Sequence, residues 1–156
     1  MSKVVVISGY FNPIHVGHLD YIESAKKLGD YLIVIVNNDN QVELKGSVPF
    51  MNEEERTRIV SKIKDVDYAY LSFDEDSTVC NSLISMYYLY RDSKDFDGMI
   101  FGNGGDRKKG DVTSEEEVCQ RLGIQLQYNV GGEKTQSSSG LIESSSRFGK
   151  SRIRGV

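Results

Sequence analysis

The chain has 156 residues, of which 38% are apolar and 27% are charged, and its formal net charge is −4. This length suits one domain around one core, and the composition is ordinary for a globular protein, with no excess of charge for a nucleic acid or a membrane surface. No apolar run approaches the roughly 20 residues of a membrane-spanning helix, and no small-residue cleavage site follows the N-terminal apolar run. We therefore expect a cytoplasmic protein with neither a nucleic acid nor a membrane as its partner.

Strand and helix patterns alternate along the chain. Residues 4–8 and 31–36 are continuous apolar runs, typical of parallel strands that helices cover on both faces, and helical spacing over 19–28 joins them. Further strands are predicted at 67–73, 98–101 and 124–130, further helices at 52–64, 78–91 and 115–122, and a loop at 37–51. The alternation predicts a doubly wound, Rossmann-like α/β parallel sheet, whose ligands bind beyond the carboxyl ends of its strands.

The C-terminal residues differ from the rest in charge. Residues 143–156 contain four basic residues and one acidic residue, a net charge of +3, so we predict a single domain over 1–142 and a polar basic tail over 143–156. A solvated end and an arm that contacts phosphate or a partner both remain open for this tail.

Both histidines of the chain lie in the loop after the first strand. His15 and His18 stand three residues apart at the mouth of a helix, where their rings can converge and where free N–H groups and the helix dipole favour an anion. Gly17 between them lets a ligand approach the backbone closely. These residues alone leave a phosphate site, a metal site and an ordinary helix start open. Because they lie in a loop, we expect both histidines to serve chemistry and to contribute little to the fold.

The loop resembles a known signature. Gly9-Tyr10-Phe11-Asn12-Pro13-Ile14-His15-Val16-Gly17-His18 is similar to the GxFDxxHxGH motif of the cytidylyltransferase-like (HxGH) nucleotidyltransferases, which it matches at Gly9, Phe11, His15, Gly17 and His18. Asn12 stands where the glycerol-3-phosphate cytidylyltransferase and heptose-1-phosphate adenylyltransferase types usually have aspartate, and the Asn-Pro pair is more similar to nicotinate mononucleotide adenylyltransferases. Over about residues 3–142 the resemblance is strongest to the first two types.

Further segments follow the order of that family: residues 28–34, 37–39, the lysine loop 44–46, the arginine-bearing helix 55–67, the glycine-rich 104–106 and the serine element 137–142. Each has an ordinary structural alternative. Lys45 can be a solvated lysine, Arg56 an ion-pair partner on an acidic helix face, residues 102–105 a turn, and the serines a helix cap.

The resemblance implies transfer of a nucleotidyl group, CMP in preference to AMP, from a nucleoside triphosphate to a phosphorylated small molecule such as glycerol 3-phosphate or a sugar phosphate. It implies catalytic roles for His15, His18 and Lys45, and an acceptor- or phosphate-binding role for Arg56. The nucleotide-binding positions that it implies are Gly9, Tyr10, Phe11, Asn12, Gly17, Asn103, Gly105, Asp106, Ser137, Ser138 and Ser139.

The resemblance also implies Mg²⁺ held mainly by the substrate phosphates, with no metal site of the protein's own. Two alternatives stand beside the cytidylyltransferase: an adenylyltransferase that acts on a sugar 1-phosphate or a coenzyme precursor, and a non-catalytic nucleotide-binding module. A homodimer is also left open.

Overall fold

The computed structural model describes residues 2–104 and 113–131. Within these residues five strands form one sheet in the order β3-β2-β1-β4-β5, and each strand pairs with its neighbours in parallel. The strands are β1 (Ser2–Gly9), β2 (Tyr31–Val36), β3 (Tyr68–Leu71), β4 (Phe96–Gly102) and β5 (Gln125–Gln127). The predicted fold class, a doubly wound parallel α/β sheet, is confirmed.

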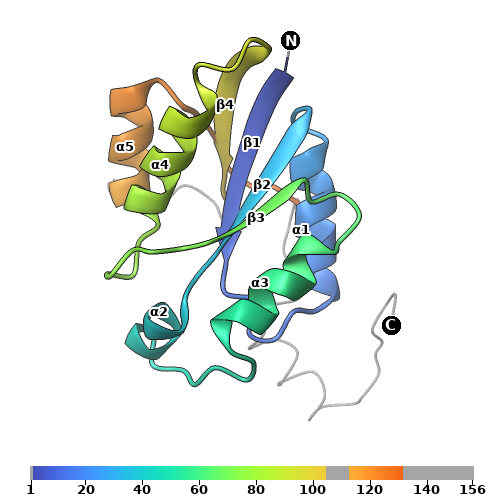
Figure 1. Cartoon of the computed structure of the whole chain (residues 1–156), viewed down its shortest axis with the longest axis vertical. Coiled ribbons are helices and arrows are strands. Elements are labelled where there is room, and N and C mark those ends of the chain that lie inside the picture. The colour runs from blue at the N-terminus through green and yellow to red at the C-terminus, as the bar shows by residue number, and fades with distance from the viewer. Residues whose placement is uncertain (1, 105–112, 132–156) are drawn as a thin grey trace.

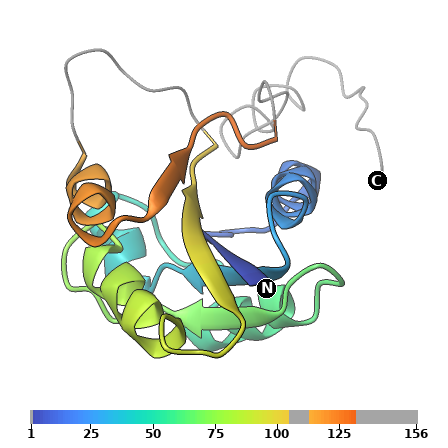
Figure 2. The same ribbon diagram turned by 90° about the horizontal axis from the view of Figure 1, so that it is seen from above.

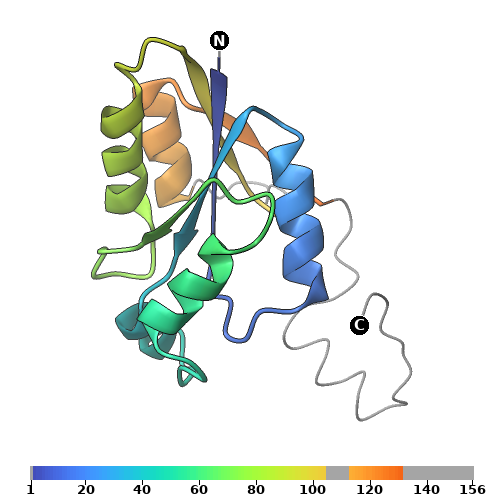
Figure 3. The ribbon, with the colours of Figure 1, turned by 45° about the vertical axis from the view of Figure 1, so that its right-hand side comes forward.

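Helices cover both faces of the sheet (Figure 1). One face carries α1 (Val16–Lys26) and α3 (Glu53–Ser61), and the other carries α4 (Cys80–Tyr90) and α5 (Ser114–Leu122), as Figure 3 also shows. No helix of the described ranges has the length and apolar character that crossing a membrane requires.

The alternation of side chains along the strands divides the core in two. Val4 and Val6 of β1 pack with Leu83 of α4 on one face, whereas Val5 and Ile7 pack with Ile22 of α1 on the other. All six side chains are at most 4% exposed. Because both faces are buried, the strands are apolar throughout, which is the pattern that made them recognisable in the sequence.

The region predicted as a loop over 37–51 contains a short helix, α2 (Asp39–Leu44). Asn38 caps it: its side chain accepts from Gln41 N, and the Gln41 side chain accepts from Asn38 N. This Asn–Gln capping box stabilises six residues whose composition is too polar to predict as a helix. The chain then runs through residues 46–51, here called the acceptor-side loop, to the start of α3.

The order of the strands creates a switch point. The chain passes from β1 outward through β2 to β3, and then returns across the sheet to place β4 on the other side of β1. Figure 2 shows α1 on the opposite side of the strands from α4 and α5. At such a point the connections diverge to both faces, and a crevice opens outside the carboxyl ends of β1 and β4.

Candidate active site

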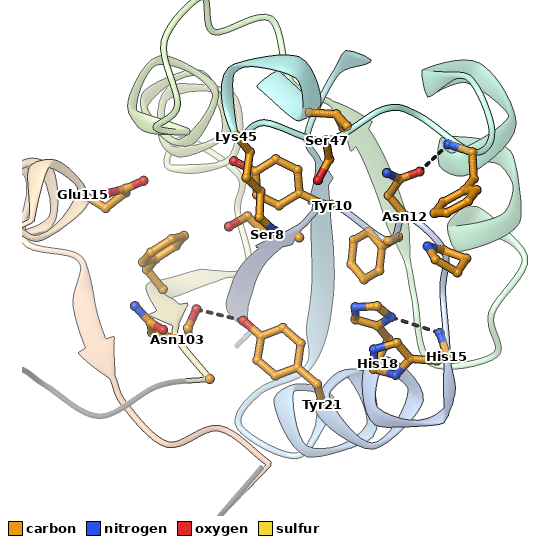
Figure 4. A pocket seen from close by; sticks show the side chains of 18 of the residues that line it. Ser8, Tyr10, Asn12, His15, His18, Tyr21, Lys45, Ser47, Asn103 and Glu115 are labelled. Carbon is orange, nitrogen blue, oxygen red and sulfur yellow. Dashed lines mark hydrogen bonds between the residues drawn. The ribbon is translucent and has the colours of Figure 1, made fainter. Parts of the chain in front are cut away.

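A cavity of about 910 Å³ lies beyond the carboxyl ends of the central strands (Figure 4). Its wall is built from the end of β1 and the loop into α1, from α2 and the acceptor-side loop, from the end of β4, and from the start of α5. This volume suits one or two small substrates. The lining residues are Ser8, Gly9, Tyr10, Phe11, Asn12, Pro13, His15, His18, Tyr21, Val42, Lys45, Ser47, Val48, Phe50, Phe101, Gly102, Asn103, Gly104, Thr113 and Glu115.

The two histidines form the N-terminal cap of α1. His15 is the N-cap residue, and its Nδ1 accepts a hydrogen bond from Gly17 N at 3.0 Å. In return, His18 Nδ1 accepts from His15 N, also at 3.0 Å. The two histidine rings stack with their centroids 3.9 Å apart, and the Phe11 and His18 rings form an edge-to-face pair with their centroids 4.9 Å apart. The expectation that these histidines contribute little to the fold is therefore wrong, because they close a capping box.

The same hydrogen bonds set the protonation of the rings. Since each Nδ1 accepts from a main-chain N–H, each neutral ring carries its proton on Nε2. Burial lowers the pKa of His15, so this ring stays neutral at physiological pH. Its Nε2 is shielded from solvent and has no hydrogen-bond partner within residues 2–104 and 113–131. The pair thus places Nε2–H groups, that of His15 shielded from solvent, near the N-terminus of an 11-residue helix, whose dipole favours an anion.

The start of the loop is shaped by Phe11. Its ring is 2% exposed, and its backbone has a φ of +51°, the left-handed region. A Cβ on Gly9 would come within 2.7 Å of this ring, so only glycine fits beneath it. Gly9 and Phe11, two of the matched signature positions, thus serve the conformation that carries the histidines.

Lys45 lies at the C-terminal end of α2, exposed and on the cavity wall. Its ammonium stands 4.1 Å from the centroid of the Tyr10 ring, a cation–π distance that holds the charge over the cavity. Burial, and then the charge of Glu115, raise the pKa of the Tyr10 hydroxyl. Tyr10 therefore stays neutral and acts as a platform for the lysine.

Asn12 connects the histidine-bearing loop to the acceptor-side loop. Its Nδ2 donates to Val48 O at 3.0 Å, and its Oδ1 accepts from Phe50 N at 2.7 Å. Both bonds go to main-chain groups, so Asn12 fixes the path of the second loop whatever side chains that loop carries.

Arg56 lies behind the cavity wall rather than on it. Its side chain has 0% exposure, and it donates from Nε to Met51 O at 3.0 Å and from Nη2 to Asp39 Oδ1 at 2.7 Å. Nη1 donates at 2.7 Å to both Tyr10 O and Asn37 O. The predicted contact with an acceptor phosphate is not one that this geometry offers, because the guanidinium is enclosed and holds together the loops that follow β1 and β2.

The opposite flank of the cavity is formed by the end of β4. Asn103 lies there, its N–H donating to Gln127 O and its carbonyl accepting from Val130 N. The Tyr21 hydroxyl donates to Gly102 O at 3.3 Å, and burial raises the pKa of this hydroxyl. Glu115, the acidic residue on the described part of the wall, accepts from Val79 N.

Most of the predicted residues that the structure describes meet at this cavity. Gly9, Tyr10, Phe11, Asn12, His15, His18, Lys45 and Asn103 line it, whereas Gly17 and Arg56 do not. Gly105, Asp106 and Ser137 to Ser139 lie outside the described residues, as does the tail over 143–156. Their roles stay predictions.

Sequence reasoning missed several lining residues, among them Val48, Phe50, Tyr21, Thr113 and Glu115. The signal that could have found Val48 and Phe50 is their position in a loop directly after the lysine, where apolar side chains have no core to enter. In the described ranges no group of three or more His, Cys, Asp and Glu side chains is placed to hold a metal ion.

Comparison with known proteins identifies the family. The model for cytidylyltransferase-like proteins matches residues 6–124. An FAD synthase from Aciduliprofundum boonei is 34% identical over 122 residues, which cover 78% of this chain and 73% of that protein. The chain belongs to the cytidylyltransferase-like family, so the resemblance seen in the sequence is confirmed.

Other relatives match over parts of their length. An FAD synthase from Ferroglobus placidus is 50% identical over 74 residues, 47% of this chain. The chain spans about half the length of this relative and of an FAD synthase from Thermoplasma acidophilum, 48% and 51%. The bifunctional protein HldE from Citrobacter koseri is 35% identical over 133 residues, covering 82% of this chain and 25% of HldE.

Two solved structures share the fold. The lipopolysaccharide core biosynthesis protein from Thermoplasma volcanium superposes with a TM-score of 0.59 at 25% identity, over 82% of this chain and 94% of that one. A putative nicotinate-nucleotide adenylyltransferase from Vibrio parahaemolyticus gives a TM-score of 0.57 at 17% identity, over 97% and 90%.

Proposed function

We propose that this chain is a nucleotidyltransferase that transfers AMP from ATP to the phosphate of a small-molecule acceptor, with release of pyrophosphate. The observation that carries the proposal is the histidine pair, whose Nδ1 atoms are both occupied by main-chain N–H groups, so that each neutral ring is an Nε2–H donor at a helix N-terminus. Such N–H donors suit phosphate oxygens, which accept hydrogen bonds in the substrate and in the transition state.

In this reaction an oxygen of the acceptor phosphate attacks the α-phosphorus of the triphosphate. The new O–P bond forms as the bond between the α-phosphorus and the bridging oxygen to the β-phosphate breaks, and pyrophosphate carries away that electron pair. No protein nucleophile is required. The contribution of the protein is to position the two substrates and to stabilise negative charge, with His15, His18 and Lys45 directed at the phosphates.

Mg²⁺ is part of the proposal as a companion of the triphosphate. The described cavity wall carries one carboxylate, that of Glu115, and no preformed cluster of ligands, a donor set that suits a cation bound chiefly through substrate oxygens. When bound, the ion would neutralise charge on the phosphates.

The names of the relatives favour ATP over CTP as the nucleotide, whereas the sequence alone favoured CMP transfer. FAD consists of FMN joined to AMP through a pyrophosphate linkage, so the name FAD synthase, printed for relatives that include the one covering 78% of this chain, points to an adenylyl donor and a flavin acceptor. We therefore propose FMN as the first acceptor to test.

The test is pyrophosphate release by the purified chain with Mg²⁺ and either ATP or CTP, in the presence of FMN, glycerol 3-phosphate or a sugar 1-phosphate. The proposal expects release with ATP and FMN, with FAD formed in equal amount. Faster release with CTP would restore the cytidylyl assignment. No release with any pair would leave the chain as a non-catalytic nucleotide-binding module and would overturn the proposed activity.

A further inference from the structure

The acceptor-side loop presents apolar side chains to the cavity. Val48 and Phe50 are 77% and 76% exposed, yet both line the cavity wall together with Pro13. Scattered exposed apolar residues are ordinary on a protein surface, but two large ones beside each other at the rim of a ligand cavity form a surface that a bound apolar group can cover.

Hydrogen bonds hold this surface in a fixed relation to the histidines. Asn12 donates to Val48 O and accepts from Phe50 N, so it satisfies an acceptor and a donor at once. Only an amide side chain of this size does both. An ionised aspartate, the usual residue in the glycerol-3-phosphate and heptose-1-phosphate types, can accept from Phe50 N but would turn an oxygen toward Val48 O.

The topology indicates which substrate lies against the loop. The crevice at the switch point is bounded by β1 and β4, and on this side the cavity is lined by residues 101–104. A nucleotide fits there, beyond the carboxyl ends of the strands. The acceptor-side loop comes after β2, which lies on the other side of β1 from β4, and this leaves the loop to the second substrate.

We propose that the acceptor-side loop, held by Asn12, is the binding site for a flat apolar ring on the acceptor. Phe50, Val48 and Pro13 supply the contact surface, and Asn12 is a positioning residue that sets its distance from the reacting phosphate. The site therefore selects phosphorylated acceptors that carry an aromatic ring system over polyol phosphates such as glycerol 3-phosphate. This inference rests on the proposed function and specifies its substrate class.

The first measurement is binding without nucleotide, so that it does not depend on turnover. Isothermal titration of the chain with FMN, riboflavin and glycerol 3-phosphate is compared between the unaltered protein, Phe50→Ala and the matched control Leu89→Ala. Leu89 is likewise an exposed apolar residue, 61% exposed, on α4 and outside the cavity wall. Since Phe50 is exposed, its removal should leave the melting temperature unchanged within about 2 °C.

The proposal expects Phe50→Ala to weaken FMN and riboflavin binding roughly tenfold or more, while Leu89→Ala binds as the unaltered protein does. Unchanged flavin affinity in Phe50→Ala would overturn it, and so would the absence of flavin binding. A loss of affinity for ATP instead of FMN would assign the loop to the nucleotide base and would also overturn it.

Asn12→Asp tests the positioning role. It should raise the KM for FMN by a larger factor than it lowers kcat, because the loop loses its hydrogen bond through Val48 O while the histidines keep their cap. A lower kcat with an unchanged KM for FMN would contradict this role.

If pyrophosphate release fails with every acceptor but flavin binding still depends on Phe50, the proposed activity falls and the ring site stands. If release is efficient with glycerol 3-phosphate and insensitive to Phe50, the activity stands and the ring site falls.

Discussion

His15 and His18 close the capping box of α1, and we propose that their Nε2–H groups also donate to phosphate; a pair of substitutions can separate these two functions. The chain offers its own template in α2, where Gln41 accepts from Asn38 N as His18 accepts from His15 N, and Asn38 accepts from Gln41 N where His15 accepts from Gly17 N. His15→Asn and His18→Gln should therefore keep an acceptor near each main-chain N–H that the histidines now serve, while removing both Nε2 atoms.

The size of each effect follows from these contacts. His15→Ala loses the cap and should lower the free energy of unfolding by about 1 kcal/mol, which shifts the melting temperature of a chain of this length by about 2–4 °C. His15→Asn should melt within about 1 °C of the unaltered protein, because asparagine is among the best N-cap residues. Both substitutions should lower kcat by roughly 10² to 10³, the usual loss for one donor to transition-state charge.

The assay pairs thermal melts by circular dichroism with steady-state pyrophosphate release for His15→Ala, His15→Asn and His18→Gln. Activity loss in His15→Asn without loss of stability is the signature of a catalytic donor. If His15→Asn retains both its melting temperature and near-full turnover, the histidine is only a cap, and the assignment of phosphate binding to this pair is refuted.

Three further predictions follow from the geometry. Arg56→Ala and Arg56→Lys should each lower the free energy of unfolding by about 3 kcal/mol, because neither residue can donate to the four acceptors that the buried guanidinium joins. Thermal melts should show this as a loss of about 6–12 °C in melting temperature. A stable Arg56→Ala with slow turnover would instead restore a phosphate-binding role. Lys45→Ala should slow turnover roughly 10²-fold and leave the melting temperature unchanged, and Lys45→Arg is the control that keeps the charge. A lower melting temperature with a normal rate would show that the lysine is structural. Burial lowers the pKa of His15 below its usual 6.5, so as the pH falls this histidine takes up a proton in the unfolded chain before it does so in the folded one. Urea melts of the unaltered protein should therefore show a loss of stability below about pH 6.5, and His15→Asn should lose less. Equal loss in both proteins would contradict the lowered pKa.

The parts of the fold that the sequence predicted are those with strong local patterns. Residues 31–36 were predicted as a strand with the bounds that β2 has, because a continuous run of six apolar residues, five of them buried in the structure, is typical of a central parallel strand. The end of α5 was predicted from Gly123, which adopts a left-handed φ of 74°. Helix α2 was missed because its stability comes from a capping box and from the contacts of Gln41 with residues 76 and 78, distant in sequence.

The candidate site was predictable where a residue acts through its own motif. The histidine loop was recognised from its motif, and residues 9–13, His15 and His18 line the cavity, whereas Ile14, Val16 and Gly17 do not. Arg56 and Phe50 were not interpretable in this way, because burial is not a property of residue type. An arginine becomes structural, and a phenylalanine exposed, only through the path of loops that the sequence does not specify locally.

The two anchors of the acceptor-side loop share one property that bears on how such a site can change its acceptor. Asn12 binds the main-chain groups of residues 48 and 50, and Arg56 binds the carbonyl of residue 51, so these hydrogen bonds all go to main-chain groups of the loop. The loop can therefore exchange the side chains it presents without moving its backbone. Arg56 also holds the carbonyl of Tyr10 in the loop that leads to the histidines. If the loop binds the acceptor as we propose, substitutions at positions 48 and 50 should change KM among acceptors and leave kcat largely unchanged, because the histidine cap keeps its hydrogen bonds.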